Sequence, residues 1–312
     1  MAQESRAGSS WASHLPPETL ITEIPIAQPE PRPSYGLALG LFIATLCTTL
    51  LAGAAMDSGD PFFPFRHPSE IYRGIPFSFS LMAILLTHEM GHYLTSRYYG
   101  VKASLPYFIP APPVILNPIG TFGAFISMRS PILKRQALLE IGAMGPIAGF
   151  VVAFVAVWVG LENSTVAQTP AESQIWLGSP LLFSGLAAWL VGLPGEGFYL
   201  ALHPVAVAGW FGLFVTALNL LPIGQLDGGH ITYALFGRKH RIISIMAVLA
   251  LAILGVVGWP GWFVWGILGA IIGLRHPPVV DQDLPLGRRQ RLIAWASLVI
   301  FVLTFTPVPF SV

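Results

Sequence analysis

The sequence of residues 81–97 is Leu81-Met-Ala-Ile-Leu-Leu-Thr-His-Glu-Met-Gly-His-Tyr-Leu-Thr-Ser-Arg97, which places an H-E-x-x-H pattern inside an apolar segment. Residues i and i+4 share one face of a helix, so His88 and His92 can bind the same metal ion. Glu89 can hold a water molecule at that ion and accept its proton. The alternative is a set of polar residues that only cap a helix end. Because ionisable groups within a membrane helix are costly and usually functional, we interpret the pattern as a metal site.

The composition predicts a polytopic membrane protein. Of 312 residues, 54% are hydrophobic and only 10% are charged, against about 25% in an ordinary soluble domain. The net charge of +1 gives no support for a nucleic-acid partner. The single cysteine, Cys47, excludes an internal disulfide and a cysteine-rich zinc site. Any metal must therefore be held by histidine and carboxylate side chains.

We expect an all-α membrane fold with about six to seven transmembrane or re-entrant helices, since one span needs about 20 apolar residues. Residues 1–34 are predicted to be a disordered, proline-rich arm, and residues 35–312 a membrane-embedded domain with its core at 75–240. The expected helical segments are 35–56, 75–98, 140–162, 203–222, 242–274 and 292–306, with 181–193 too short to cross. Residues 242–274 are too long for one span, and Gly258-Trp-Pro-Gly261 favours a hairpin of two short helices.

Residues 101–130 behave differently from the rest of the chain. They are rich in proline and cannot form one continuous helix. Residues 121–128 partly alternate and contain strand-forming residues, so we expect a short membrane-associated strand or hairpin there. Irregular backbone at membrane depth is tolerated only where protein buries it or where it lines a cavity.

The positive-inside rule gives a predicted orientation. With a cytoplasmic N-terminus and the 242–274 hairpin, all 16 Lys and Arg residues except Arg66 and Arg73 lie on the cytoplasmic side. If 242–274 crossed once, four of these residues would move outside. With a cytoplasmic N-terminus the second span runs from outside to inside, which places the histidine motif in its cytoplasmic half. With 181–193 not crossing, the fourth span runs the same way and brings Asp227 to the same depth.

A catalytic zinc takes three protein ligands, so the motif needs a third from elsewhere. Asp227 is the best candidate because it is the only carboxylate between residues 196 and 281 and directly follows a predicted span. It could instead cap a helix in a glycine-rich turn. His230 and His240 are competing ligands, whereas His203 is expected on the far side of the membrane.

His88-Glu-Met-Gly-His92 and Asn219-Leu-Leu-Pro-Ile-Gly-Gln-Leu-Asp-Gly-Gly229 together resemble the paired signature of the site-2 proteases, which are intramembrane zinc metalloproteases. The resemblance implies that His88, His92 and Asp227 bind one Zn²⁺ per chain and that Glu89 is the general base. It also implies that Asn219 holds the substrate or the developing oxyanion.

Two further segments are similar to motifs of this family. Gly145-Pro-Ile-Ala-Gly149 resembles its small-residue motif, and small residues there let a neighbouring helix approach closely. The segment 120–128 resembles the strand that pairs with an unwound substrate, which implies substrate contacts at Gly120, Gly123 and Phe125. On the residues alone, these glycines could equally shape a turn. The second signature resembles the branch found in bacteria and plastids. No loop exceeds about 35 residues, so we expect no inserted PDZ domain.

The sequence therefore predicts an intramembrane zinc metalloendopeptidase that cleaves in or near a transmembrane helix of a membrane-protein substrate. The expected location is a bacterial inner membrane or a plastid membrane, with the N-terminus and active site towards the cytoplasm. One alternative is a catalytically silent metal-binding scaffold, against which the presence of Glu89 argues. The other is a zinc transporter, which the nearly apolar outer halves of the spans disfavour. The sequence specifies no substrate and no oligomeric state.

Overall fold

The computed structural model describes residues 35–112, 117–168, 176–192, 198–274, 276, 277, 279, 281 and 285–311. From Tyr35 onwards the chain forms one compact unit. The proline-rich arm predicted for residues 1–34 lies outside the described residues.

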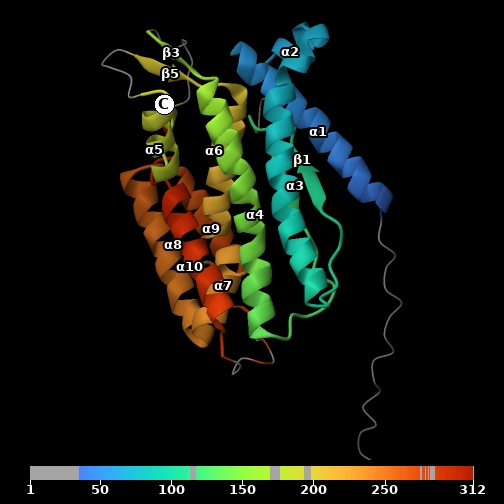
Figure 1. The fold of residues 1–312 in the computed structure, drawn as a ribbon, viewed down its shortest axis with the longest axis vertical. Helices are drawn as coiled ribbons and strands as arrows, with labels where there is room; N and C mark the ends of the chain where they lie inside the picture. The colour runs from blue at the N-terminus through green and yellow to red at the C-terminus, as the bar shows by residue number, and fades with distance from the viewer. Residues whose placement is uncertain are drawn as a thin grey trace, which may run out of the picture. The chain divides into compact units, whose positions relative to one another are not determined.

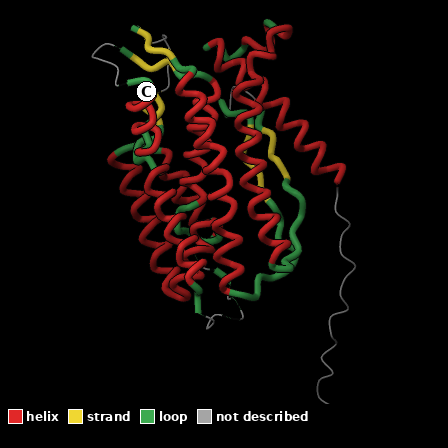
Figure 2. Tube along the Cα trace, in the orientation of Figure 1, coloured by secondary structure: helices red, strands yellow, loops and turns green. Residues whose placement is uncertain are grey.

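Helices account for most of the described residues (Figures 1 and 2). The α-helices are α1 (Tyr35–Ser58), α2 (Phe63–Arg66), α3 (Ile75–Tyr98), α4 (Arg135–Glu162), α5 (Leu181–Leu190), α6 (Pro204–Asn219), α7 (Asp227–Phe236), α8 (His240–Val257), α9 (Gly261–Ile272) and α10 (Arg288–Thr304). Short 3-10 helices, η2 (Pro68–Gly74) and η3 (Gly237–Lys239), precede α3 and α8. Figure 1 shows α1 and α3 on one side of α4 and α6, with α8, α9 and α10 on the other.

Three helical segments of the described chain are long and apolar enough to cross a membrane: Tyr35–Ser58, Arg135–Glu162 and Asp227–Val257. The third is not one straight helix, because Gly237 at the α7–η3 junction has a φ of +55°. The 24-residue α3 is not among them, since the polar motif lowers its apolar content. The count of six to seven spans therefore stays a prediction.

The predicted strand segment is an antiparallel hairpin. It pairs β1 (Tyr107–Pro110) with β2 (Thr121–Phe125), and both strands contact α1 while β2 also contacts α3. Phe108 is buried and packs edge-to-face on Phe42 of α1. The irregular backbone is thus covered by protein on one side, as its position in a membrane domain requires.

Two smaller two-stranded sheets have no counterpart in the sequence prediction. One pairs β3 (Thr165–Ala167) with β5 (Tyr199–Ala201), and the other pairs β4 (Trp176–Leu177) with β6 (Phe310–Ser311). Strands of two or three residues are too short to show an alternating pattern. The second sheet ties the end of the chain beside α6, because Trp210 packs edge-to-face on Phe310.

The hairpin predicted for residues 242–274 is present as α8 and α9, which pack together on either side of Gly258–Pro260. Gly255 lies so close to the ring of Phe263 that a Cβ would come within 2.9 Å of it. The indole N–H of Trp262 donates to the Pro307 carbonyl at 2.7 Å, which connects α9 to the segment after α10.

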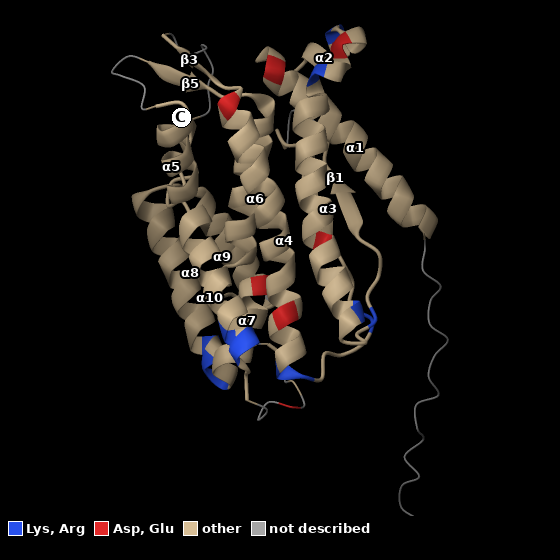
Figure 3. Ribbon diagram, in the orientation of Figure 1, with Lys and Arg blue, Asp and Glu red and all other residues tan. Residues whose placement is uncertain are grey.

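Lysine and arginine residues gather at the two ends of the bundle, whereas acidic residues also lie along its helices (Figure 3). Basic residues lie at the end of α3, at the start of α4 and around α7 and η3, all at one end. Arg66 and Arg73 lie at the opposite end, in α2 and η2, where they pair with Asp60 at 2.8 Å and Glu70 at 2.6 Å. This is the grouping of basic residues that the positive-inside argument predicts for the described part of the chain.

Candidate metal centre

Helix α3 presents His88 and His92 on one buried face. Their side chains are one helical turn apart, and their Nε2 atoms are 3.1 Å from each other. Each residue is only 5–6% exposed, as is Glu89. Two buried imidazole nitrogens facing one point suit a shared ligand better than solvent contact.

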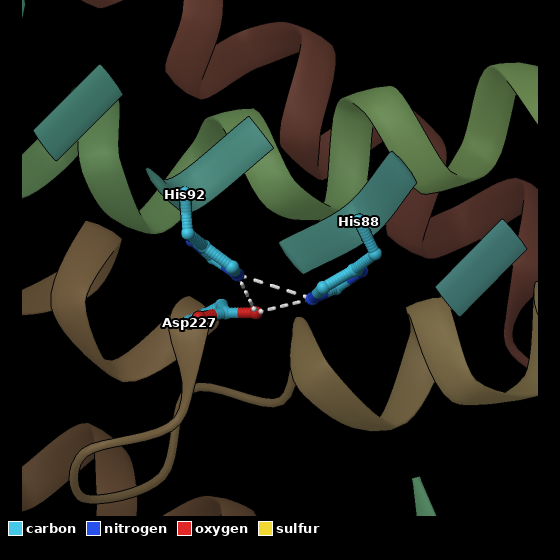
Figure 4. A group of neighbouring side chains, drawn as sticks. All are labelled: His88, His92 and Asp227. Atoms are coloured by element: carbon cyan, nitrogen blue, oxygen red, sulfur yellow. Dashed lines mark hydrogen bonds and ion pairs between the residues drawn. The ribbon is translucent and has the colours of Figure 1, made fainter. Parts of the chain in front are cut away.

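Asp227 is the first residue of α7 and completes the cluster (Figure 4). Its Oδ2 atom lies 3.3 Å from His88 Nε2 and 3.2 Å from His92 Nε2. Among the described residues, these three form the group of histidine and acidic side chains that could hold a metal ion. Three ligands placed tetrahedrally at about 2.0–2.1 Å from zinc would be about 3.3 Å apart. The donor types and their separations therefore fit a zinc site.

The backbone of α4 orients one of the two imidazoles. His92 Nδ1 lies 2.7 Å from the carbonyl oxygen of Ile141, an acceptor that makes Nδ1 the donor. Nε2 is then the nitrogen left with a lone pair towards Asp227. Metal-binding histidines in proteins usually have such a partner on the second nitrogen.

Glycines on one face of α4 make room for the cluster. A Cβ at Gly145 would lie 2.0 Å from His92 Nε2, and one at Gly149 would lie 3.0 Å from the Cβ of His88. A Cβ at Gly142 would lie 2.8 Å from His230 of α7. The close helix packing predicted for these small residues is therefore present, and it brings α4 against the candidate ligands themselves.

Arg135 fixes α7 from the start of α4. Its guanidinium donates to the carbonyls of Ala234 and Leu235, the latter at 3.0 Å. These carbonyls belong to the last turn of α7, where the helix dipole favours a positive charge. Arg135 thereby holds the helix that begins at Asp227.

Glu140 joins three segments beside the centre. It is buried and accepts from Arg289 and Gln290 of α10, both at 2.8 Å. Burial and the neighbouring Glu140 carboxylate raise the pKa of Tyr99, at the end of α3, to about 12. The Tyr99 phenol therefore stays protonated and can donate to Glu140, next to the Ile141 carbonyl that orients His92.

The other two predicted catalytic residues, Asn219 and Glu89, lie close to the cluster. Asn219, the last residue of α6, has its Nδ2 atom 3.3 Å from His88 Nε2. Glu89 follows His88 on α3, and the backbone N–H of Ile126, just after β2, is within hydrogen-bonding reach of its carboxylate. The hairpin thus approaches the centre through the residue that follows β2.

The hairpin residues have different surroundings. Gly120, with a φ of +78°, packs on α1 so closely that a Cβ would meet the Thr48 carbonyl oxygen at 2.4 Å. Gly123, with a φ of +99°, has open space at its Cβ position. Phe125 is 47% exposed. Gly120 therefore shapes the packing, whereas Gly123 and Phe125 leave one surface of β2 accessible.

The competing histidines lie outside the three-residue group. His230 Nδ1 lies 2.7 Å from His276 Nε2, and His240 Nε2 lies 3.2 Å from the Ser244 hydroxyl. Burial lowers the pKa of His276, which stacks on Tyr233. His203 caps the start of α6, about 24 Å along that helix from Asn219.

Sequence reasoning did not identify Ile141, Glu140 or His276 as neighbours of the site. The Ile141 contact uses a backbone carbonyl, which no residue type reveals. Glu140 did carry a signal, because it is an acidic residue at the edge of an apolar segment. Its partners on α10 are about 150 positions further along the chain and could not be inferred.

The model of peptidase family M50 matches residues 76–257, which include both segments that supply the cluster. The chain belongs to peptidase family M50. This is the family of the site-2 proteases, so the predicted resemblance is confirmed. The M50 match covers α3 to α8 and ends before α9 and α10.

Two chloroplast proteins illustrate this relationship. The probable zinc metalloprotease EGY2, chloroplastic, of Oryza sativa subsp. indica is 32% identical over 217 residues, which cover 68% of this chain and 39% of the relative. The probable zinc metalloprotease EGY1, chloroplastic, of Arabidopsis thaliana is 30% identical over 313 residues, which cover 89% of this chain and 55% of the relative. The chain thus spans from about two fifths to just over half of their lengths. No solved structure gives a significant match.

Proposed function

We propose that this M50 family member is an intramembrane zinc metalloendopeptidase that hydrolyses a peptide bond in or near a transmembrane helix of a membrane-protein substrate. One observation carries the proposal. His88 and His92 of α3 and Asp227 of α7 come from two distant segments of the chain, yet their candidate ligand atoms lie 3.1–3.3 Å apart within a bundle of apolar helices. The family and the names of its relatives support the same chemistry.

One Zn²⁺ per chain would be held by Nε2 of both histidines and by the Asp227 carboxylate. Zinc bound there supplies a Lewis acid that activates water and polarises a peptide carbonyl. These three side chains would supply three of the ligands of a catalytic zinc, which typically has a further position for water or substrate.

Glu89 is the general base of the proposed reaction. Its carboxylate lies close enough to His88, His92 and Asp227 to interact electrostatically with all three. It takes the proton of the attacking water and delivers it to the nitrogen of the leaving amine. Burial of Glu89 keeps bulk water from competing for that proton.

Asn219 is proposed to stabilise the developing oxyanion. Its Nδ2 group lies 3.3 Å from a candidate ligand nitrogen, so a donor stands at the edge of the centre without being part of it. Loss of one oxyanion donor typically raises a barrier by about 2.7–4 kcal/mol.

β2 is proposed to hold the substrate. A transmembrane helix satisfies its own backbone hydrogen bonds, so its peptide groups must be exposed locally before hydrolysis. An extended substrate segment can satisfy them again by adding to a strand edge. Gly123 leaves room for close approach and Phe125 offers an exposed ring, in a strand that leads directly to the Glu89 neighbour Ile126.

In the proposed orientation the basic end of the bundle faces the cytoplasm or its plastid equivalent. The N-terminus and the active site are proposed to be directed to the same side. The grouping of described basic residues at one end supports this orientation. The proposed location is a bacterial inner membrane or a plastid membrane, the latter being where the named relatives are said to reside.

The direct test is cleavage of single-span model substrates in detergent by the wild type and by Glu89→Gln, with zinc content measured on both. We expect zinc in both proteins and cleavage by the wild type alone, with the rate of the variant reduced at least about 100-fold. Full activity of Glu89→Gln would contradict the general-base assignment. Zinc in both without cleavage of any substrate by either would favour a silent metal-binding scaffold.

A further inference from the structure

A cavity of about 490 Å³ lies between α7, α8 and α10, apart from the histidine cluster. Its walls are mainly apolar side chains, among them Ile231 and Leu235 of α7, Ile243 of α8, and Leu298 and Phe301 of α10. This volume is in the range of pockets that bind small molecules. The cavity is not closed, because the wall residues Trp295, Leu298 and Phe236 are also exposed on the outer face of the bundle.

The hydroxyl groups in the cavity wall already have hydrogen-bond partners within the protein. The Thr232 hydroxyl donates to carbonyls of its own helix, Gly228 and Gly229, and the Ser297 hydroxyl donates to Ile293 at 3.0 Å. These hydroxyls are therefore already satisfied within α7 and α10. A hydrocarbon chain suits the interior, whereas a polar molecule would lose its hydrogen bonds to water there.

Arg291 is the charged residue in the wall, at the basic end of the bundle. It is exposed, and in the described part of the chain no carboxylate pairs with it. Arg288 and Arg289 lie in the same first turn of α10, which has no acidic residue. The N-terminus of a helix carries a partial positive charge, so basic residues there are unfavourable for the helix by themselves. Together with that partial charge they attract an anion. Arg289 is neutralised by Glu140, so Arg291 remains for an external negative charge.

The length of the cavity matches one lipid leaflet. Its wall on α10 extends from Arg291 to Phe301, ten residues or about 15 Å along a helix. Half of a hydrocarbon core of about 30 Å has the same depth. The cavity therefore has a positively charged group at one end and an apolar interior as deep as one leaflet. These features match a lipid whose head group carries a negative charge.

We propose that this cavity binds one anionic phospholipid, with its phosphate head group at Arg291 and an acyl chain between α7 and α10. Basic pockets between membrane helices on the cytoplasmic side are typical sites for anionic head groups. The buried wall residues Leu220 and Gly228 directly follow Asn219 and Asp227 in the chain. A bound lipid would thus support the segment that supplies the third ligand of the metal centre.

The test measures lipid binding to the full chain, so its outcome is independent of proteolysis. The purified protein is titrated with phosphatidylglycerol or with phosphatidylcholine and examined by native mass spectrometry. We expect one phosphatidylglycerol to bind clearly more tightly than phosphatidylcholine. Arg291→Ala should weaken phosphatidylglycerol binding about fivefold and leave phosphatidylcholine unchanged. Arg97→Ala, at the same end of the molecule but on α3, should change neither.

A matched pair on α10 tests the slot itself. Ala294 is buried in the cavity wall, whereas Ala296 is exposed and is not part of it. Ala294→Phe should abolish tight binding and Ala296→Phe should preserve it, with melting temperatures used to check that both variants fold. Equal binding of the two lipids by the wild type, or unchanged binding by Arg291→Ala, would overturn the proposal even if Ala294→Phe does not fold. Equal effects of the two phenylalanine variants would do the same.

Discussion

Gly145 determines how closely α4 can approach the candidate zinc ligands. Because a Cβ at this position would lie 2.0 Å from His92 Nε2, the imidazole could not keep its place beside Asp227. The contact with the Ile141 carbonyl would be disturbed at the same time. The small-residue motif therefore has a specific role in addition to general helix packing.

We predict that Gly145→Ala lowers zinc affinity by about tenfold or more, the range seen when a ligand loses its supporting partner. The measurement is competition for zinc with a chelator of known affinity. Gly185→Ala on α5 is the control, because nothing lies within 4 Å of a Cβ there. Equal zinc affinity of the two variants would show that α4 does not constrain His92.

At the same scale, the three residues of the cluster were predictable from the sequence and the groups that support them were not. His88 and His92 follow from helical spacing, and Asp227 follows from being the lone carboxylate after an apolar segment. The Ile141 carbonyl and the Glu140 contacts depend on the packing of α4, α3 and α10 in space. Sequence spacing contains no information on such long-range contacts.

At the scale of elements, α7 matters most because it begins with Asp227 and is only ten residues long. So short a helix depends on tertiary contacts for its position. Arg135 provides them by donating to the carbonyls of Ala234 and Leu235 at its far end. The position of Asp227, the proposed third ligand, thus depends on an arginine of another helix.

We predict that Arg135→Gln lowers the stability of the protein by about 1.5–3 kcal/mol, the usual contribution of hydrogen bonds to a charged group. Zinc should also be lost more readily, since α7 is less firmly held. Thermal unfolding in detergent and zinc retention during dialysis measure the two effects. Arg97→Gln, an exposed arginine at the same end, serves as the control. A variant as stable as the control would contradict the anchoring role.

Elements with a clear length or composition signal were predictable. The α8–α9 hairpin follows from an apolar stretch too long for one span with a Gly and Pro break in it. The β1–β2 hairpin follows from a proline-rich segment that ends in strand-forming residues. The two sheets that pair β3 with β5 and β4 with β6 were missed because their strands are only two or three residues long.

At the scale of the whole molecule, the arrangement of charge indicates an orientation. The described basic residues lie at one end of the bundle apart from Arg66 and Arg73, whose elements α2 and η2 lie at the other. Apolar content and length identify three described segments that could cross a membrane, because α3 contains the polar motif and other helices are short, so the count of six to seven spans stays a prediction.

We predict that a cysteine in place of Lys239 reacts only with reagents on the cytoplasmic side, and one in place of Phe62 only with reagents on the other. Both positions are exposed and lie at opposite ends of the bundle. Cys47, which is exposed on α1, is first replaced by serine to remove its background. Labelling of both positions from one side would contradict the proposed topology.

The central claim is that two distant segments build one zinc site from His88, His92 and Asp227. The most direct measurement is zinc X-ray absorption on the purified protein, with zinc content determined for the wild type and Asp227→Asn. We predict about one zinc per wild-type chain, bound by two imidazole nitrogens and a carboxylate oxygen at about 2.0–2.2 Å, and loss of most zinc from Asp227→Asn. Equal zinc content in both proteins with an unchanged ligand shell would contradict it.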